Sequence, residues 1–392
     1  MRKRENFLPI AIPDITKKEK DQVLESLDTG WISTGPKVKE FEEKFAEYQN
    51  TNYAIAVSSC TAALFLIAKC LGIQEGDHVI VPTITWPSTA NIVEQLGATP
   101  VFVDVDLHTM NTTPKIIKER ILEYKEKIKL IIPVHMSGLP VDIDKIQKVG
   151  KKYDIPVTYD AAHAVFSEYK NKKVGQFGIA SSFSFYAIKN MTTGDGGIIT
   201  LNDQDLYEKI KLWSYHGMDK DAWKRYSEEG GSPHVEAIVP GYKFNMTDLN
   251  AGLGLAQLSR KNELLSKRNQ LIEYYFENLK NIDSIELPVI KSEYGKWGNH
   301  VFVIKLLDEQ IDRNRMINVL RKFNIGTNIH FLPCHKNYYY RKKYPNIELP
   351  NSEWLMEHII SLPLCTKYSK KDIKYVSDVV KYIIDKKLAH KH

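Results

Sequence analysis

The sequence predicts an α/β fold made of two lobes, the larger of which contains a mainly parallel β-sheet covered by helices. Short β-branched runs alternate with amphipathic segments of helical length through roughly the first 200 residues, which is typical of such sheets. After about residue 255 the pattern changes to a long, charged helical segment and then to mixed strand-like and helical stretches. A chain of 392 residues can bury a main core and a second, smaller one.

The strands and helices expected in the larger lobe follow from two patterns of apolar residues, one typical of strands and one typical of helices. Runs of β-branched and apolar residues predict strands over 78–82, 100–105, 130–134, 156–160, 181–186 and 197–201. Apolar residues spaced three and four apart predict helices over 61–71, 88–96, 114–127 and 142–153. Because α/β sheets bind ligands at the carboxyl ends of their parallel strands, we expect a functional site at that edge.

A smaller α+β lobe is predicted over 256–392, after a larger lobe over 1–255. Its expected elements are a long helix, two strand-like runs and two terminal helices, over 257–280, 300–306, 325–331, 352–360 and 370–386. No repeat or low-complexity linker separates the lobes, so we expect them to pack firmly through the long helix. The N-terminal segment is a candidate to pack on the smaller lobe.

Composition and charge exclude several classes of function. The formal net charge is +6, but the lysines are spread over helical patterns and form no basic stripe with aromatics, so nucleic-acid binding is not expected. The four cysteines form no CxxC pair, so neither a disulfide framework nor a zinc site is predicted, and a reducing cytoplasm fits best. The apolar N-terminal stretch is cut by Pro9 and Pro13, and the apolar run 53–73 contains Lys69. Neither a signal peptide nor a membrane span is therefore predicted.

Two residues at predicted strand ends carry the strongest chemical signal. Asp160 ends the strand 156–160 and is followed by two alanines, which allow a ligand to approach closely. By itself this acid could equally cap the next helix. Lys189 follows the strand 181–186 and leads into the glycine-rich turn 194–197, where the backbone can bend sharply. By itself a lysine in a loop is usually a solvated surface charge.

Together, Asp160 and Lys189 suit the cofactor pyridoxal 5'-phosphate (PLP). Enzymes that use PLP need a lysine that binds the cofactor as a Schiff base and a carboxylate beside its pyridinium nitrogen. We expect Asp160 to stay ionised, because the pyridinium charge opposes the effect of desolvation. The amine of Lys189 is then expected to carry a proton between the substrate carbon and the cofactor carbon.

Two further segments fit a cofactor site. Small and hydroxyl residues at 58–64 open an apolar helical stretch, and the unpaired N–H groups at such a helix start can bind a phosphate. The alternative is an ordinary Ser/Thr helix cap. Trp86 follows a predicted strand end, where its ring could stack on a flat cofactor. The alternative for Trp86 is packing in the core.

Ordered segments along nearly the whole chain match one known family. They are GWISTGP at 30–36, SSCTAAL at 58–64, PTITWPSTAN at 82–91, GATPVFVDVD at 97–106, IIPVHMSG at 131–138, YDAAHA at 159–164, SFSFYAIKN at 182–190, GDGG at 194–197, HGM at 216–218, GYKFNMTDLNAGLGLAQL at 241–258 and IGTNIHF at 325–331. With these segments the chain resembles the DegT/DnrJ/StrS family of nucleotide-sugar aminotransferases. The resemblance implies an aspartate-aminotransferase-like fold (PLP fold type I), with a mainly parallel seven-stranded sheet in a large domain and a smaller α+β C-terminal domain.

The resemblance also implies which residues surround the cofactor ring. Lys189 would form the Schiff base, Asp160 would pair with the pyridinium nitrogen, and His163 would lie near the ring hydroxyl. Trp86 would stack on the ring. Dehydratases of the same family carry histidine at the position of Lys189, so the lysine favours transamination. One departure from the family pattern is Asp195 in place of glutamate, which we expect to adjust the turn without loss of activity.

The phosphate and the substrate are assigned to other residues by the same resemblance. Cys60, Thr61 and Ser184 would hold the cofactor phosphate. Asn245 would reach the phosphate of the neighbouring subunit's cofactor, so a homodimer with shared active sites is implied. His330 would line the sugar pocket from the smaller lobe.

Within the family, the chain is most similar to the branch that aminates C4 of UDP-linked 4-keto sugars, which includes the UDP-4-amino-4-deoxy-L-arabinose aminotransferases. The implied reaction moves an amino group from L-glutamate, which leaves as 2-oxoglutarate, to the sugar ketone through pyridoxamine phosphate. Its product would be a 4-amino sugar for surface polysaccharide or glycan biosynthesis. Amination at C3 or of a cyclic ketone such as an inositol derivative is an alternative. A catalytically silent relative with a binding or regulatory role is an alternative from another class.

Overall fold

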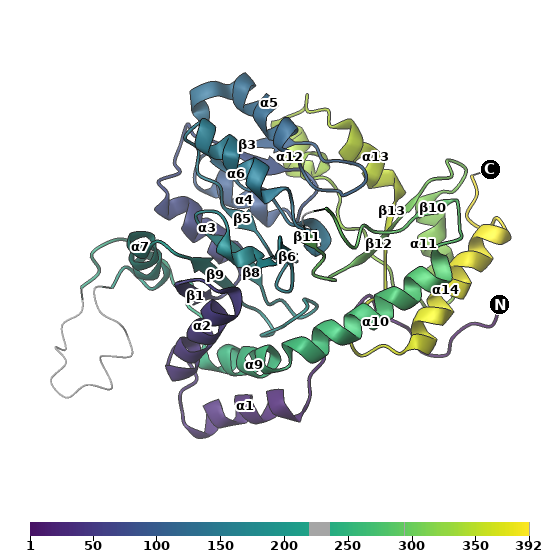
Figure 1. The fold of residues 1–392 in the computed structure, drawn as a ribbon, viewed down its shortest axis with the longest axis horizontal. Helices are drawn as coiled ribbons and strands as arrows, with labels where there is room; N and C mark the ends of the chain where they lie inside the picture. Colours follow the sequence, from purple (N-terminus) through teal and green to yellow (C-terminus); the bar gives the residue numbers. More distant parts are fainter. Residues whose placement is uncertain (219–235, 294, 392) are drawn as a thin grey trace.

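The computed structural model describes residues 1–218, 236–293 and 295–391, and it has mixed α/β content. A layered α/β part lies on one side of the molecule, and a smaller part that carries both chain ends lies on the other (Figure 1). The long helix α10 (Lys261–Leu279) runs between the two parts. Each part has its own large cluster of buried apolar side chains, as the length of the chain predicts.

The α/β part is built on seven short strands. They are β1 (Tyr53–Val57), β2 (His78–Pro82), β3 (Thr99–Val103), β4 (Ile128–Ile131), β5 (Tyr159–Asp160), β8 (Ser181–Ser184) and β9 (Gly197–Leu201). Strand β2 is parallel to β3 and β4, and β5 is parallel to β8, whereas β9 runs antiparallel to both β1 and β8. The bounds predicted for β2 and β9 are confirmed. Strand β1 was not predicted, because it merges in the sequence with the apolar helix that follows.

The regular ladders form a four-stranded sheet and a three-stranded sheet, so the seven-stranded sheet is not confirmed as one continuous ladder. Where β4 meets β5, Ile131 N–H donates to Pro156 O at 3.1 Å and Asp160 N–H donates to Pro133 O at 2.9 Å. Both prolines lack an N–H, so the pairing is reduced here to isolated parallel bridges. The bridges still bring the carboxyl ends of β4 and β5 to the same edge.

Helices cover both faces of these sheets (Figure 1). Successive residues of β2 show this, because Ile80 packs into one apolar cluster while Val79 and Val81 pack into another. The cluster around Ile80 includes residues of α2 (Pro36–Gln49), α5 (Pro114–Tyr124) and α6 (Ile143–Lys152). The opposite face is covered by α3 (Cys60–Cys70), α4 (Ser88–Gln95) and α7 (Gln204–Ser214). None of the described helices has the length and apolar character needed to cross a bilayer.

The smaller part contains an antiparallel sheet of three strands, in the order β10 (Ile285–Glu286), β12 (Phe302–Leu306) and β13 (Ile359–Leu362). The helices α11 (Arg313–Lys322) and α14 (Lys370–Asp385) pack with it. The strand predicted over 325–331 is wrong: only isolated bridges occur there, and Asn328 Oδ1 accepts the Ile329 N–H that a ladder would need. Helix α13 (Pro350–His358) begins and ends within two residues of the predicted 352–360.

The long helix predicted over 257–280 is confirmed as α10, except that it begins at Lys261 and the four residues before it belong to the end of another helix and its cap. Helix α9 (Asp248–Ser259) ends at Arg260, and α10 begins at the next residue. Thr247 caps α9 by accepting the N–H of Asn250 at 3.2 Å. The break lets Arg260 turn toward the N-terminal helix α1 (Lys17–Asp28), a contact that periodicity along 257–280 could not reveal.

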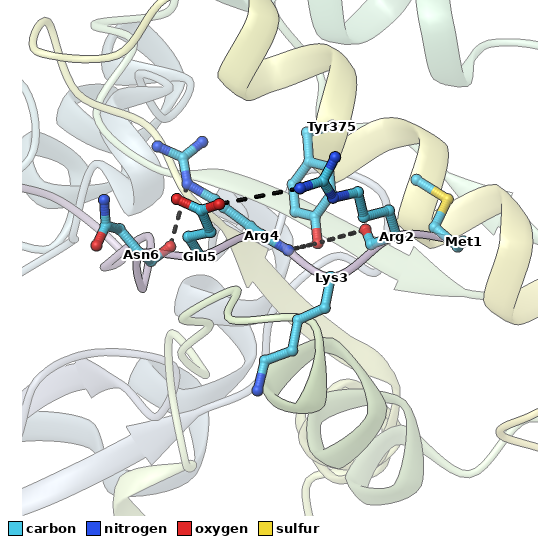
Figure 2. Close-up of a pocket in the computed structure, with 7 residues that line it drawn as sticks. All are labelled: Met1, Arg2, Lys3, Arg4, Glu5, Asn6 and Tyr375. Carbon is cyan, nitrogen blue, oxygen red and sulfur yellow. Dashed lines mark hydrogen bonds and ion pairs between the residues drawn. The ribbon is translucent and has the colours of Figure 1, made fainter.

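The N-terminal segment packs on the smaller part. Leu8 N–H donates to Asn324 O at 2.8 Å, and Gly326 N–H donates to Leu8 O at 2.7 Å. Arg4 forms an ion pair with Asp372, the first-turn acid of α14. Figure 2 shows the shallow hollow that the segment forms with Tyr375, whose hydroxyl accepts the N–H of Arg4 at 2.9 Å. The exact division of the chain into domains at residue 255 stays a prediction.

A buried ion pair fixes α1 against the α9–α10 break. Arg260 Nη1 lies 2.7 Å from Glu19 Oε1, and Gln257 Nε2 donates to the same oxygen at 2.8 Å. Burial by itself would raise the pKa of Glu19, but hydrogen bonds from Thr16 and Arg260 outweigh it and lower the pKa to about 2. Glu263 Oε1 lies 2.8 Å from Arg260 Nη2 but is 61% exposed, so it offers a matched comparison.

We predict that Glu19→Gln lowers the free energy of unfolding by about 3 kcal/mol at pH 7, because it removes the fully buried carboxylate beside Arg260 and leaves that charge with the exposed Glu263 and with Asp14 at 3.6 Å. Glu263→Gln should change it by less than about 1 kcal/mol, since that pair is exposed. Because the folded-state pKa of Glu19 lies below its usual 4.5, the stabilisation is present at neutral pH and is lost as the pH falls toward 2. Urea unfolding at pH 7 and pH 3 checks both points, and equal losses for the two variants would contradict them.

Candidate active site

Asp160 lies at the carboxyl end of β5, where the fold places it in the interior with 4% of its surface exposed. Thr89 Oγ1, on α4, donates to Asp160 Oδ2 at 2.8 Å, and Ala162 N–H donates to Oδ1 at 3.0 Å. Burial raises the pKa of Asp160, although these two hydrogen bonds and the charge of Lys189 act in the opposite direction. The carboxylate is thus held by two donors in a buried position.

Lys189 lies in the loop between β8 and β9, on the same side of the fold as Asp160. The loop is closed by two backbone hydrogen bonds, from Phe185 N–H to Gly196 O and from Thr193 N–H to Phe185 O, both 2.9 Å. Burial lowers the pKa of Lys189 to about 8, a shift that the acidic groups of Cys60 and Asp160 limit. A lysine with this pKa is partly neutral near physiological pH and can act as a nucleophile.

The glycine-rich turn brings the Lys189 loop against the start of helix α3. A Cβ atom on Gly197 would lie 2.5 Å from Cys60 N, and one on Gly196 would lie 2.1 Å from Thr193 Oγ1. Only glycine permits this approach of two backbones. Asp195, the departure from the family pattern, is exposed, and the turn around it is closed by Thr193 Oγ1, which donates to Asp195 O at 2.8 Å.

The residues predicted to hold a phosphate lie together at the start of α3. Ser59 caps the helix by accepting the N–H of Ala62 at 3.1 Å, so the capping alternative is confirmed for Ser59 itself. Cys60 and Thr61 are half-buried, and their N–H groups belong to the first turn, which has no acceptor within the helix. Ser184 pairs with Gly197 across β8 and β9, which places it beside the same helix start.

His163 is buried next to this site, with 6% of its surface exposed. Among the described residues, no group lies within hydrogen-bonding distance of its Nδ1. Burial lowers the pKa of His163 well below its usual value, and the charges of Lys189 and His330 act in the same direction. The imidazole is therefore neutral and presents a ring nitrogen that a ligand can satisfy.

The ring of Phe331 lies next to the rings of His163, Trp86 and His330. The Phe331 ring lies 5.9 Å from the Trp86 ring and 5.7 Å from the His163 ring. Trp86 is 63% exposed, so the alternative of core packing is wrong and its ring is free to meet a ligand. His330 is buried, its Nδ1 lies 2.7 Å from Ser361 Oγ, and burial lowers its pKa to about 3. Its contact with a sugar stays a prediction.

Asn245 lies beside β1 of its own chain. Its backbone pairs with Val57, and the preceding Phe244 O accepts the N–H of Ser58 at 2.7 Å. The side-chain Nδ2 donates to Thr34 Oγ1, whereas Oδ1 is buried without a partner among the described residues. The role of Asn245 in a neighbouring subunit's site stays a prediction.

The structure adds three residues to which the sequence assigned no role. Thr89 holds Asp160, and its place three residues after Trp86 is the signal that could have drawn attention to it. Asn190 directly follows Lys189, and its Oδ1 lies 2.9 Å from His300 Nδ1. The His300 ring lies 4.4 Å from the His163 ring. No local pattern marks His300, because Asn190 and His163, which its side chain meets, lie more than 100 residues away in sequence.

These residues fit PLP. Asp160 is a buried acid that could pair with a ring nitrogen, Lys189 is an amine with a lowered pKa that could bond an aldehyde, and His163 Nδ1 has no partner among the described residues. The open first turn of α3 supplies donors and a favourable dipole for a phosphate. Within the described residues, no group of three or more metal-binding side chains competes with this reading of the site.

Known proteins resemble this chain over nearly its whole length. Residues 13–381 match the model of the DegT/DnrJ/EryC1/StrS aminotransferase family. The spore coat polysaccharide biosynthesis protein SpsC of Bacillus subtilis is 40% identical over 389 residues, which are 98% of this chain and 99% of SpsC.

Solved structures agree with this match. The putative sugar aminotransferase Spr1654 from Streptococcus pneumoniae, solved in a PMP form and a PLP form, is 33% identical in the PMP form, with a TM-score of 0.89 over 97% of this chain and 99% of that chain. Helicobacter pylori PseC, an aminotransferase involved in the biosynthesis of pseudoaminic acid, is 27% identical, with a TM-score of 0.90 over 97% of this chain and all of that one. The chain therefore belongs to the DegT/DnrJ/EryC1/StrS aminotransferase family.

Proposed function

We propose that this PLP-dependent aminotransferase moves an amino group from L-glutamate to a UDP-linked 4-keto sugar, giving a 4-amino sugar for surface polysaccharide or glycan biosynthesis. The observation that carries the proposal is the meeting of Asp160, Lys189 and the open start of α3 at one strand-end edge. SpsC, by its name a polysaccharide biosynthesis protein, supports the sugar. The PLP and PMP forms of Spr1654 support the cofactor.

Each group at the site has one task in this proposal. Lys189 holds the cofactor aldehyde, Asp160 faces the ring nitrogen and His163 faces the ring hydroxyl. Cys60 and Thr61 at the start of α3, together with Ser184, hold the phosphate, and Trp86 covers the ring. When bound, PLP supplies the electron sink that makes the α-proton of an amino acid acidic.

Lys189 is also the proton carrier between the two carbon atoms that react. Its pKa of about 8 lies near the pH of the cell interior, so the amine can both accept and return a proton. The lowered pKa values of His163 and His330 keep these rings uncharged, so they do not add positive charge beside the amine. A neutral imidazole can donate or accept a hydrogen bond to a polar substrate group.

The proposal includes a homodimer and a cytoplasmic location. Asn245 Oδ1, buried and without a partner among the described residues, supports a contact that a second subunit completes. All four cysteines are free thiols, which suits a reducing compartment. Most of the binding energy for the sugar would come from its nucleotide, which holds the ketone in place for the reaction.

Lys189→Ala should lower turnover by at least about 1,000-fold, because it removes both the covalent anchor and the proton carrier. The measurement is formation of amino sugar with glutamate and PLP. Borohydride reduction of the wild-type protein with PLP should add the cofactor mass to the peptide that contains Lys189. Lys129→Ala, which removes an exposed lysine of β4, is the control and should keep full activity. Full turnover by Lys189→Ala would overturn the assignment.

The rate of PLP loading should rise with pH up to about 8 and then level off. The reason is that only the neutral amine of Lys189 attacks the aldehyde, and burial lowers its pKa to about 8 from the usual 10.5. Stopped-flow absorbance of the PLP-free protein mixed with PLP between pH 6 and pH 10 gives the profile. A rate that keeps rising to pH 10 would show an unperturbed lysine.

A panel of nucleotide-linked 4-keto and 3-keto sugars and a keto-inositol should separate the alternatives. We expect amination of a UDP-linked 4-keto sugar with a kcat/KM at least about tenfold above the others, with NMR placing nitrogen at C4. Nitrogen at C3, or turnover of the cyclitol alone, would favour the enzyme alternatives. A pure protein that stays colourless with PLP would favour the catalytically silent alternative.

A further inference from the structure

The segment 298–300 enters the active-site region from the smaller part and is held there by Arg268 and by the backbone of Gly138. Arg268 Nη1, on α10, donates to Asn299 O and His300 O, both at 3.0 Å. Gly298 N–H donates to Gly138 O at 2.9 Å. Arg268 has 3% of its surface exposed, so this clamp is buried. The backbone of His300 is therefore fixed without help from its side chain.

Among the described residues, the side chain of His300 hydrogen-bonds to Asn190. A second contact of Asn190 shows which of the two side chains donates. Asn190 Nδ2 donates to Gly298 O, so Asn190 Oδ1 is the atom that faces His300 Nδ1, at 2.9 Å. An amide oxygen only accepts, so Nδ1 of His300 carries the proton. Burial also lowers the pKa of His300 well below its usual value, with the charges of His163 and Lys189 acting in the same direction. The ring is a neutral Nδ1–H imidazole.

Asn190 connects this ring to the cofactor lysine. It is the residue next to Lys189 and is itself 5% exposed, so its side chain anchors the loop in the interior. The ring of His300 also lies beside the ring of His163, with 4.4 Å between the two ring centroids. A Cβ atom on Gly138 would lie 2.5 Å from His163 O and 3.2 Å from the backbone of Gly298. The backbone at Gly138 therefore packs against both residues with no room for a side chain.

We propose that His300 is a positioning residue for the transamination site: its Nδ1–H holds Asn190 and with it the Lys189 loop, and its ring seats His163. The inference rests on the proposed function, since it concerns how Lys189 meets PLP. It also gives the smaller part a role in supporting a site whose proposed reacting groups come from the α/β part.

The test compares variants that keep or remove the donor at the Nδ1 position. His300→Asn keeps an N–H at that position, whereas His300→Leu fills space without one. We expect PLP loading of the PLP-free protein to slow at least tenfold in His300→Leu and to stay within threefold of wild type in His300→Asn. In the loaded enzyme, kcat should fall for His300→Leu while KM for the nucleotide sugar stays within twofold, because the nucleotide contacts are unchanged.

A double-mutant cycle shows whether His300 acts through Asn190. Asn190→Leu should slow loading as His300→Leu does, and the double variant should be no more than twofold slower than the slower single variant. Gln257→Leu, which changes a buried amide near α1, is the control, and its effect should multiply with that of His300→Leu. Asn190→Asp keeps an acceptor for His300, so it should load faster than Asn190→Leu and provides a test if a leucine variant fails to fold.

The outcomes separate the two proposals. A wild-type protein that does not load PLP would refute the proposed function. A wild-type protein that loads PLP, together with a folded His300→Leu that loads at the same rate, would refute the positioning role and leave the proposed function intact. Equal slowing by His300→Leu and His300→Asn would also refute it, since the retained donor would then have no effect.

Discussion

The burial of charged and titratable groups at the strand-end site is the constraint on which the other features depend. Burial shifts both central groups toward their neutral forms, raising the pKa of Asp160 and lowering that of Lys189. In water an aspartate and a lysine would carry full charges and would be poor partners for this chemistry. In the low-dielectric interior the charged form of the acid is less favoured, and the amine of Lys189, with a pKa of about 8, is partly neutral near physiological pH.

The fold supplies this environment through close approaches of backbone. The isolated bridges between β4 and β5 fix the end of β5 and therefore Asp160. Asp160 lies beside α4, where Thr89 donates to the carboxylate. Gly197 lets the strand after the lysine loop lie against the first turn of α3, and Gly196 leaves room for the side chain of Thr193. Among the described residues, these contacts leave His163 Nδ1 without a hydrogen-bond partner, and the first-turn N–H groups of Cys60 and Thr61 have no acceptor within the helix.

The smaller part completes the site with neutral rings. His300 and His330 both come from beyond residue 256, and both have pKa values lowered by burial, as does His163. Three imidazolium ions so close together would repel one another and the protonated lysine. As neutral groups they pack at ring distances of 4.4 to 6.4 Å and keep directional hydrogen-bonding atoms. The clamp from Arg268 holds His300 in this arrangement.

The sequence by itself determined the fold class and most strands and helices of the α/β part, and it singled out Asp160 and Lys189 as candidates at the strand ends. These features are local, because neighbouring residues in the sequence are enough to recognise them. Examples are a β-branched run, a capped helix start and a lysine before glycines. Only the tertiary structure decided the break at Arg260, the irregular stretch at 325–331 and the neighbours of His163. Arg260 turns toward Glu19, and His300 meets Asn190 across 110 positions of sequence. Contacts between residues so far apart in sequence, and the pKa values that they set, depend on which surfaces are buried together. The periodicity of apolar residues along the chain does not reveal which surfaces these are.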